Sequence, residues 1–239
     1  MIQPVIAIHG GAGAMSRAAM SPEKEQEYLS ALESILTAGQ AVLAKGGSAL
    51  DAVTEAVRLL EDCPLFNAGH GAVFTSAATH ELDAAIMDGA TLRSGAIAGV
   101  HRVRNPIFAA RKVMENSKHV FFVGEGAEAF AKEEGVELVD SSYFSTEARR
   151  EQLLRVQRET PEAAVLDHDG QAMVARGQPA PADPLDSDKK FGTVGAVALD
   201  AQGNLAAATS TGGITNKQVG RVGDAPLIGA GTYASNKTC

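Results

Sequence analysis

The chain has 239 residues, a hydrophobic fraction of 45%, a net charge of −8 and a pI near 5.3. A chain of this length forms one or two domains with a sizeable core, and its acidic balance argues against binding driven by nucleic-acid phosphates or an anionic membrane. Its two cysteines, Cys63 and Cys239, make no disulfide framework. Neither a signal peptide nor a membrane span is predicted, so we expect a protein of the reducing cytoplasm.

The first elements in chain order are predicted to be a strand and two helices. "PVIAIHGGAGA" reads as a short strand followed by a glycine-rich loop. Ser21 and Pro22 are typical of an N-cap and a first helical position, so we expect a helix over residues 21–45 that ends at "KGG". Ser48 begins a second helix, "SALDAVTEAVRLLED", with small apolar residues on one face.

The middle of the chain mixes strands and helices. Three short strand candidates, "GAVFT", "ELDAAIMDG" and "GAIAGV", predict an antiparallel sheet. Asn105 caps a helix over "NPIFAARKVMEN", and Pro106 occupies its first position. "HVFFVG" is then expected to be a strand, and "GEGAEAFAKEEG" and "STEARREQLLRVQRE" are expected to be helices.

The composition changes from about residue 159 to residue 191. This segment is rich in Pro, Asp and Ala and has no sustained period, so it is predicted to be a flexible linker, poorly ordered from about 160 to 190. After it, "TVGAVALD" and "NLAAATSTGG" flank "AQG" and predict a β-hairpin. The remainder is loop-like, with a short strand expected at "PLIGAG".

Several common site types are not favoured. The loops "HGGAGAMS" and "VGEGAEAF" match neither dinucleotide-binding nor P-loop spacing. Their glycines are therefore explained better by the close approach of two backbone segments than by phosphate binding. The six histidines are scattered without zinc-site spacing, and no G-x-S-x-G elbow is present. A nucleotide-binding domain remains as an alternative from another functional class.

The abrupt junction between the linker and the strand at Gly192-Thr193 suggests an N-terminal nucleophile. A threonine hydroxyl needs an adjacent base, and a free α-amino group has a pKa of about 7.7–8.0. Cleavage between Gly192 and Thr193 would therefore give Thr193 a base on its own backbone. The alternative is that Thr193 is simply a residue suited to opening a strand.

Two further sites lie downstream. In "TSTGG" the return strand of the hairpin brings Thr211 near the start of the first strand, where its hydroxyl could bind the nucleophile; otherwise it is a polar strand end. In "GRVGDAP", Arg221 suits a carboxylate and Asp224 an ammonium, so the two could hold the charged ends of an α-amino acid. The alternative there is an ordinary surface ion pair.

These three sites occur in order behind "HGGAGA", "LFNAGHGAVF", "ELDAAIMDG" and "AIAGV". In this combination the chain, from Val5 to its end, resembles the plant-type L-asparaginases, also called isoaspartyl or β-aspartyl peptidases, of the N-terminal nucleophile (Ntn) hydrolase superfamily. The resemblance implies an α+β fold, a four-layer αββα sandwich, made as a precursor that cleaves itself. Residues 1–192 would form the α-subunit region, and 193–239 the start of the β subunit.

The resemblance also assigns roles. Thr193 matches the nucleophile, Thr211 the threonine that orients it, and Arg221 and Asp224 the substrate-binding pair. The substrates would be L-asparagine and β-aspartyl dipeptides, and the mature enzyme a dimer of αβ pairs that needs no cofactor for catalysis. A structural sodium ion would be bound by main-chain carbonyls of the "LEDCPLFNAGHG" loop, namely those of Leu60, Glu61, Cys63, Phe66, Ala68 and His70.

One departure from the family concerns the C-terminal part. Family β subunits continue past the position of Cys239 with a strand and a "TGTG"-like loop that supplies the oxyanion hole. We therefore expect a truncated chain with slow or absent cleavage, and an unprocessed, inactive precursor-like protein is the second alternative.

Overall fold

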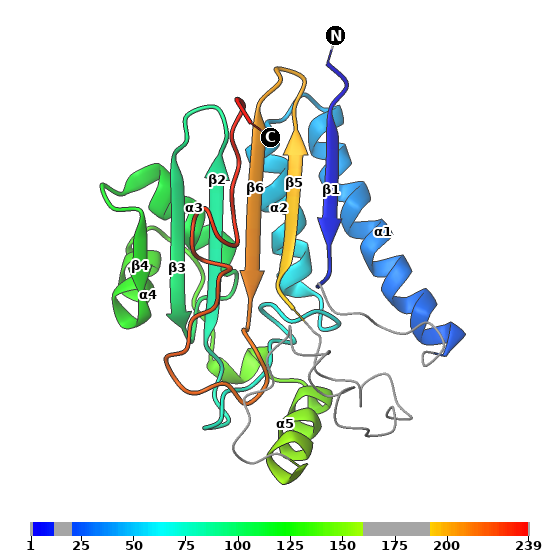
Figure 1. Cartoon of the computed structure of the whole chain (residues 1–239), viewed down its shortest axis with the longest axis vertical. Helices are drawn as coiled ribbons and strands as arrows, with labels where there is room; N and C mark the ends of the chain where they lie inside the picture. Colours follow the sequence, from blue (N-terminus) through cyan, green and yellow to red (C-terminus); the bar gives the residue numbers. More distant parts are fainter. Residues whose placement is uncertain (1, 12–20, 160–191, 239) are drawn as a thin grey trace.

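The computed structural model describes residues 2–11, 21–159 and 192–238, which form a mixed α/β fold around one sheet (Figure 1). In this part of the chain the sheet has six strands in the order β1-β5-β6-β2-β3-β4. The strands are β1 (Val5–His9), β2 (Leu82–Asp88), β3 (Ser94–Val100), β4 (Phe121–Val123), β5 (Val194–Leu199) and β6 (Leu205–Thr211). Neighbouring strands are antiparallel except β3 and β4. The predicted hairpin is thus confirmed as β5–β6, two central strands.

The predicted helices are confirmed with small shifts at their ends. They are α1 (Pro22–Ala44), α2 (Ala49–Asp62), α3 (Pro106–Asn116), α4 (Gly124–Glu133) and α5 (Glu147–Glu159), with a 3₁₀ turn, η2 (Ser141–Phe144). Ser21 and Ser48 cap α1 and α2 through their hydroxyls. Asn105 occupies the cap position of α3, but its side chain makes no cap bond and instead donates to Asp62 Oδ1 at 3.1 Å.

The core lies between one face of the sheet and the helices α1, α2 and α3 (Figure 1). The inner face of α2 is wholly buried and consists mostly of small residues, which lets the helix approach β5 and β6 closely: Ala52, Val53, Ala56, Val57 and Leu60. The opposing strand residues are equally small, including Ala196, Ala198, Ala206 and Ala208. This explains the high alanine and glycine content and the scarcity of aromatic residues.

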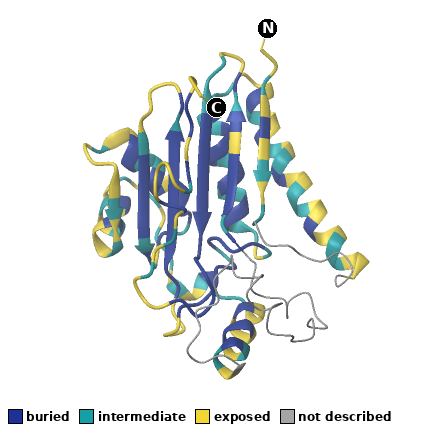
Figure 2. Ribbon diagram, in the orientation of Figure 1, coloured by how far each residue is buried: buried dark blue, intermediate teal, exposed yellow. Residues whose placement is uncertain are grey.

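The other face of the sheet is covered unevenly. The segment after β6 returns along β6 and β2 on this face, where Ala234 packs with Met87 and Ala207 (Figure 1). Val5 and Val197 lie on the same face of β1 and β5, and are 58% and 53% exposed (Figure 2). Among the described residues, this face is therefore covered over β6 and β2 and exposed at Val5 on β1 and Val197 on β5.

Two predicted strands are wrong. "GAVFT" forms only an isolated bridge between Thr75 and Lys217, because Phe74 and Ser76 bond to the chain around residue 216 and not to a sheet strand. "PLIGAG" is a series of turns with a positive φ of 88° at Gly229, and only Ile228 makes a bridge, to Thr232. The predicted linker, about 159–191, lies almost wholly outside the described residues, so its order stays a prediction.

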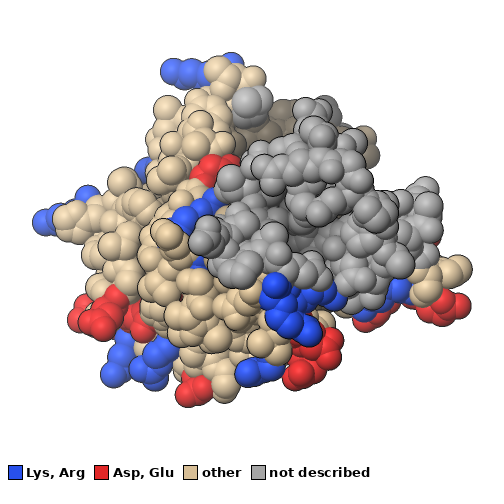
Figure 3. All heavy atoms as spheres, turned by 60° about the horizontal axis from the view of Figure 1, so that its bottom comes forward, with Lys and Arg blue, Asp and Glu red and all other residues tan. Residues whose placement is uncertain are grey.

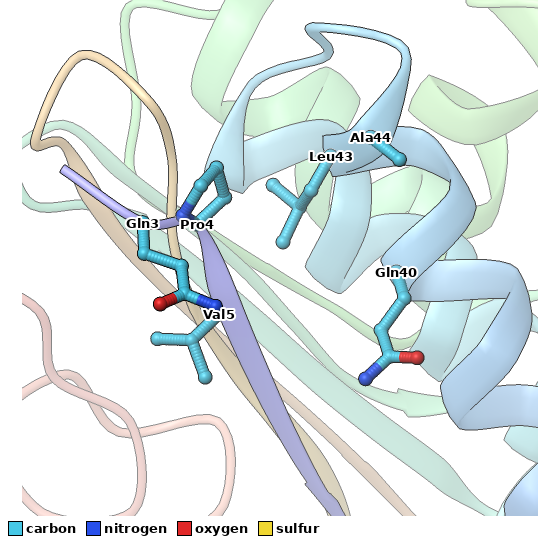
Figure 4. A pocket seen from close by; sticks show the side chains of 6 residues that line it. All are labelled: Gln3, Pro4, Val5, Gln40, Leu43 and Ala44. Carbon is cyan, nitrogen blue, oxygen red and sulfur yellow. The ribbon is translucent and has the colours of Figure 1, made fainter. Parts of the chain in front are cut away.

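A groove of about 700 Å³ separates the start of β1 from the end of α1 (Figure 4). Its lining residues are Gln3, Pro4, Val5, Gln40, Leu43 and Ala44. It lies at the opposite end of β1 from His9 and carries no ionisable side chain, so it offers no chemistry. None of the described helices is both long and apolar enough to cross a bilayer.

Candidate active site

The predicted nucleophile lies at one end of the two central strands. Val194 pairs with Ser210 across β5 and β6, so the register continued by one residue places Thr193 opposite Thr211. Thr211 in turn pairs directly with Asp83 on β2. Directly opposite residues of antiparallel strands share a face of the sheet, so Thr211 and Asp83 point to the face away from the helices. The two threonines predicted from sequence are thus neighbours, with a carboxylate in the same row.

The glycine-rich loop after β1 lies against the predicted cleavage site. A Cβ added at Gly11 would be 3.0 Å from the carbonyl oxygen of Gly192, and the φ of Gly11 is 137°, a value that favours glycine. Gly192 itself is buried and Thr193 half-buried. The close backbone approach expected of this loop is therefore present, and it occurs at the Gly192–Thr193 junction.

The turn that follows Thr211 is held by Asn67, a fully buried residue of the loop after α2. The Asn67 amide donates to the Gly213 carbonyl at 2.7 Å, and its carbonyl oxygen accepts from the Val73 N–H at 3.0 Å. The Thr211 hydroxyl accepts from the Gly213 N–H at 2.9 Å. The turn beside Thr211 is therefore fixed by buried hydrogen bonds.

Charged side chains are buried beside this row. Lys217 is fully buried, and its Nζ donates to the Glu81 carbonyl at 3.0 Å and lies 3.7 Å from Glu81 Oε2. Asp83 Oδ1 accepts from the Gly99 N–H at 2.8 Å, while its Oδ2 has no hydrogen-bond partner among the described residues. Burial raises the pKa of Asp83, an effect that the charge of Lys217 partly offsets. Burial likewise lowers the pKa of Lys217, against the attraction of Asp83 and Glu81.

The predicted substrate-binding pair lies on the next loop, at the same end of the sheet. The Gly220 N–H donates to both carboxylate oxygens of Glu81, at 2.9 and 3.0 Å, which brings Arg221 next to the buried charges. The charge of Arg221 contributes to lowering the pKa of both Asp83 and Lys217. Asp224 is exposed. Both side chains are thus accessible on one short loop.

Sequence reasoning missed four residues of this site: Asn67, Glu81, Asp83 and Lys217. One signal was available, for Asp83. Asp83 interrupts the apolar run "LDAAIM", and a charged residue in a central strand is unusual unless it is paired or functional. Lys217 carried no such signal, because "TNKQVG" reads as an exposed loop and its burial depends on tertiary contacts.

The predicted sodium loop, residues 60–70, coils tightly after α2. Three of its six candidate carbonyls already accept hydrogen bonds within the loop: Leu60 from Cys63, Cys63 from Phe66, and Glu61 from His70 at 2.7 Å. A carbonyl oxygen retains a second lone pair, so these bonds leave room for a cation. Burial raises the pKa of the Glu61 side chain to about 8, and the other carboxylate of the loop, Asp62, is paired with Arg58 at 2.8 Å. The donors expected of this loop are therefore its uncharged main-chain carbonyls.

On the described part of the face in Figure 3, basic and acidic side chains are interspersed with neutral surface. Within the described ranges, no group of three or more His, Cys, Asp or Glu side chains is arranged to hold a metal ion.

Comparison with known proteins identifies the family. The family model described as asparaginase matches residues 2–239. The isoaspartyl peptidase of Escherichia coli K12 is 61% identical over 236 residues, an alignment that covers 99% of this chain and 69% of that protein. A putative isoaspartyl peptidase/L-asparaginase of Dictyostelium discoideum is 51% identical, over 97% of this chain and 70% of its own length. The human isoaspartyl peptidase/L-asparaginase is 42% identical, over 98% of this chain and 68% of its own length. The chain therefore belongs to the asparaginase family that includes the isoaspartyl peptidases.

Proposed function

We propose that this protein is an amidohydrolase that cleaves L-asparagine and β-aspartyl dipeptides, with Thr193 as its nucleophile. Family membership supports the reaction class. The observation that supports the nucleophile is the register of β5 and β6, which brings Thr193 opposite Thr211 beside the Gly11–Gly192 approach. If Thr193 were only a strand-opening residue and Arg221 and Asp224 only a surface ion pair, these residues would not need to lie at the same end of the sheet.

Maturation would begin with the uncut chain. The Thr193 hydroxyl attacks the Gly192 carbonyl, the peptide bond to the Thr193 nitrogen breaks, and an ester forms between Gly192 and the Thr193 side chain. Water hydrolyses this ester, which releases the Gly192 carboxylate and leaves Thr193 with a free amine. The buried Gly192, held against Gly11, has its carbonyl in a fixed position for this attack.

Turnover would use the same hydroxyl. Thr193 Oγ attacks the β-carbonyl of the substrate, and its own amine accepts the proton. The amine or ammonia leaves with a proton, an aspartyl ester remains, and water hydrolyses it to aspartate. The Thr211 hydroxyl, oriented by its bond to the Gly213 N–H, would hold the nucleophile in position.

The substrate would be recognised by its aspartyl end. Arg221 presents a planar guanidinium for the α-carboxylate, and the exposed carboxylate of Asp224 accepts from the α-ammonium. Asparagine and β-aspartyl dipeptides share this end, so the Arg221–Asp224 pair, which we call the clamp, can hold both substrates.

We also propose the finer architecture that the resemblance implies: a four-layer αββα sandwich, and a mature enzyme of two αβ pairs. The apolar, exposed side chains of Val5 and Val197 on the face away from the helices support a further layer there. A sodium ion is proposed at the carbonyls of loop 60–70, where it would fix the loop that carries Asn67. It takes part in no chemical step.

The function is tested by incubating the purified protein with L-asparagine and with a β-aspartyl dipeptide, and measuring ammonia and the released amino acid. Release of aspartate from both substrates supports the proposal. Intact chain without activity would support the inactive precursor-like alternative, and specific binding in a nucleotide titration would support the nucleotide-binding alternative.

A further inference from the structure

We propose that Glu81 and Thr209 are positioning residues for substrate recognition, because they anchor the two ends of the loop that carries Arg221 and Asp224. The inference rests on the proposed function of that loop. Neither side chain belongs to the loop itself: Glu81 directly precedes β2, and Thr209 lies within β6.

The first anchor is at Gly220, the residue before Arg221. Its N–H donates to both carboxylate oxygens of Glu81, at 2.9 and 3.0 Å. Glu81 is 4% exposed, and its own position is fixed by Lys217, whose Nζ is 3.7 Å from the carboxylate and bonds to the Glu81 carbonyl. A buried carboxylate that accepts from a backbone N–H is a strong and directional contact. The start of the loop is therefore tied to β2.

The second anchor is at Ala225, the residue after Asp224. The Ala225 carbonyl accepts from the Thr209 hydroxyl at 2.9 Å and lies 3.1 Å from the Thr232 hydroxyl, and the two hydroxyls are 2.6 Å apart. All three residues are buried. The end of the loop is therefore tied to β6.

Between these anchors lie the four residues 221–224, which include both proposed substrate ligands. The Arg221 guanidinium lies against Gly223 of the same loop: a Cβ added at Gly223 would be 3.2 Å from Arg221 Nη1. Strands β2 and β6 also carry Asp83 and Thr211. The same two strands therefore position both the site of the proposed reaction and the substrate-binding pair. The register of the sheet then sets the distance between Thr193 and the Arg221–Asp224 pair. This distance selects a substrate whose amide group lies at a matching distance from its α-carbon.

The test compares three variants with a matched control. Glu81→Ala removes the first anchor, Glu81→Gln keeps a carbonyl oxygen that can accept from Gly220, and Thr209→Val removes the second anchor's hydroxyl. Glu128→Ala is the control, because Glu128, on α4, also accepts two backbone N–H bonds, from His101 and Arg102, which are not part of the loop of Arg221 and Asp224. Each variant is measured for kcat and KM with L-asparagine and for the inhibition constant of L-aspartate, the product that carries both α-groups.

We expect Glu81→Ala to raise KM and the aspartate inhibition constant about tenfold or more, with a smaller change in kcat. Glu81→Gln should restore most of the affinity, Thr209→Val should show a smaller rise of the same kind, and Glu128→Ala should leave both constants near the wild type. If Glu81→Ala does not fold, Thr209→Val decides the matter. Unchanged constants in folded Glu81→Ala or in Thr209→Val, with an active wild type, would overturn this inference but not the proposed function, as would an equal change in Glu128→Ala. A wild type that neither cleaves asparagine nor binds aspartate would overturn the proposed function, and this inference with it.

Discussion

The Asn67 side-chain amide donates to the Gly213 carbonyl at 2.7 Å across 146 residues of sequence. The bond joins the loop after α2 to the turn after β6, the turn that also holds the Thr211 hydroxyl. The same Asn67 side chain accepts from the Val73 N–H, and its main-chain carbonyl accepts from Gly212 at 3.1 Å. The conformation beside Thr211 thus depends on a residue that lies in the part of the chain before the proposed cleavage point.

Replacing Asn67 should affect stability and catalysis together. Asn67→Ala leaves a buried N–H and a buried carbonyl without their partners, each costing about 1–3 kcal/mol, so we expect a loss of roughly 3 kcal/mol in unfolding free energy. Asparaginase activity should fall at least tenfold even where the variant is folded. Urea unfolding and kcat measure the two effects. Asn116→Ala, which removes only an exposed contact to Glu134, is the control and should change neither. Full activity in folded Asn67→Ala would contradict the role given to this turn.

Arg221→Ala should weaken substrate binding much more than folding. The guanidinium is half-buried on a loop and its proposed partner is the substrate carboxylate, so a loss of about 1.5–3 kcal/mol corresponds to a 10- to 150-fold rise in KM. Steady-state kinetics and thermal unfolding measure this. The exposed Arg102→Ala variant controls for the loss of one positive charge. A KM equal to that of the wild type would rule out the clamp.

His80 should make stability depend on pH on the acid side. It is buried between Phe74 and Phe144, and burial lowers its pKa from 6.5 to about 4. Between these two values the unfolded chain binds a proton that the native chain does not, so stability is complete above pH 6.5 and is lost as the pH falls toward 4. The loss is about 1.4 kcal/mol per pH unit in this window.

The contribution of His80 can be isolated by comparing His80→Gln with the wild type in urea at pH 7.5 and pH 4.5. The wild type should be more stable than the variant at pH 7.5 by a margin that shrinks at pH 4.5, because glutamine does not titrate. His119→Gln, at an exposed position, is the control for the loss of one imidazole. A margin for His80→Gln that does not change with pH would contradict the neutral, buried imidazole.

Gly95 on β3 should tolerate no side chain. A Cβ there would overlap the Ala110 carbonyl and the Met114 amide of α3, both of them backbone groups that cannot rotate away. Gly95→Ala should therefore cost about 1–3 kcal/mol or more. Gly126→Ala on α4, where nothing lies within 4 Å of the added Cβ, should instead stabilise by about 0.5–1 kcal/mol. Thermal unfolding of both variants compares them, and equal effects would contradict the close packing of α3 on the sheet.

The local signals in the sequence predicted most of the elements for identifiable reasons. Ser21-Pro22 and Ser48 are strong helix starts, and the alanine-rich face of α2 has the helical period. "GAVFT" and "PLIGAG" failed because apolar residues next to glycine resemble strands. The backbone at the end of the first segment bonds to a distant loop, Ser76 to Lys217, and that of the second bonds within its own turn, Gly229 to Thr232. Local patterns do not carry that information.

The candidate site was predicted only where a residue's chemistry is visible in its own segment. Thr193 was found from an abrupt change of composition, and Arg221 and Asp224 from a charged, glycine-flexed loop. Asn67 and Lys217 were missed because an asparagine in a glycine-rich loop and a lysine in a polar loop look ordinary until the fold buries them. What remained hidden were the tertiary contacts that hold the site together.

The central claim is that Thr193 is both the cleavage point and the nucleophile. The most direct measurement is the intact mass and N-terminal sequence of the purified wild type, Thr193→Ala and Thr193→Ser, together with ammonia release from L-asparagine. We expect wild-type cleavage, however slow, to fall between Gly192 and Thr193, no cleavage and no ammonia for Thr193→Ala with its fold retained, and partial processing and activity for Thr193→Ser relative to the wild type, because its hydroxyl and amine remain. Cleavage or ammonia release that persists in Thr193→Ala would contradict the account.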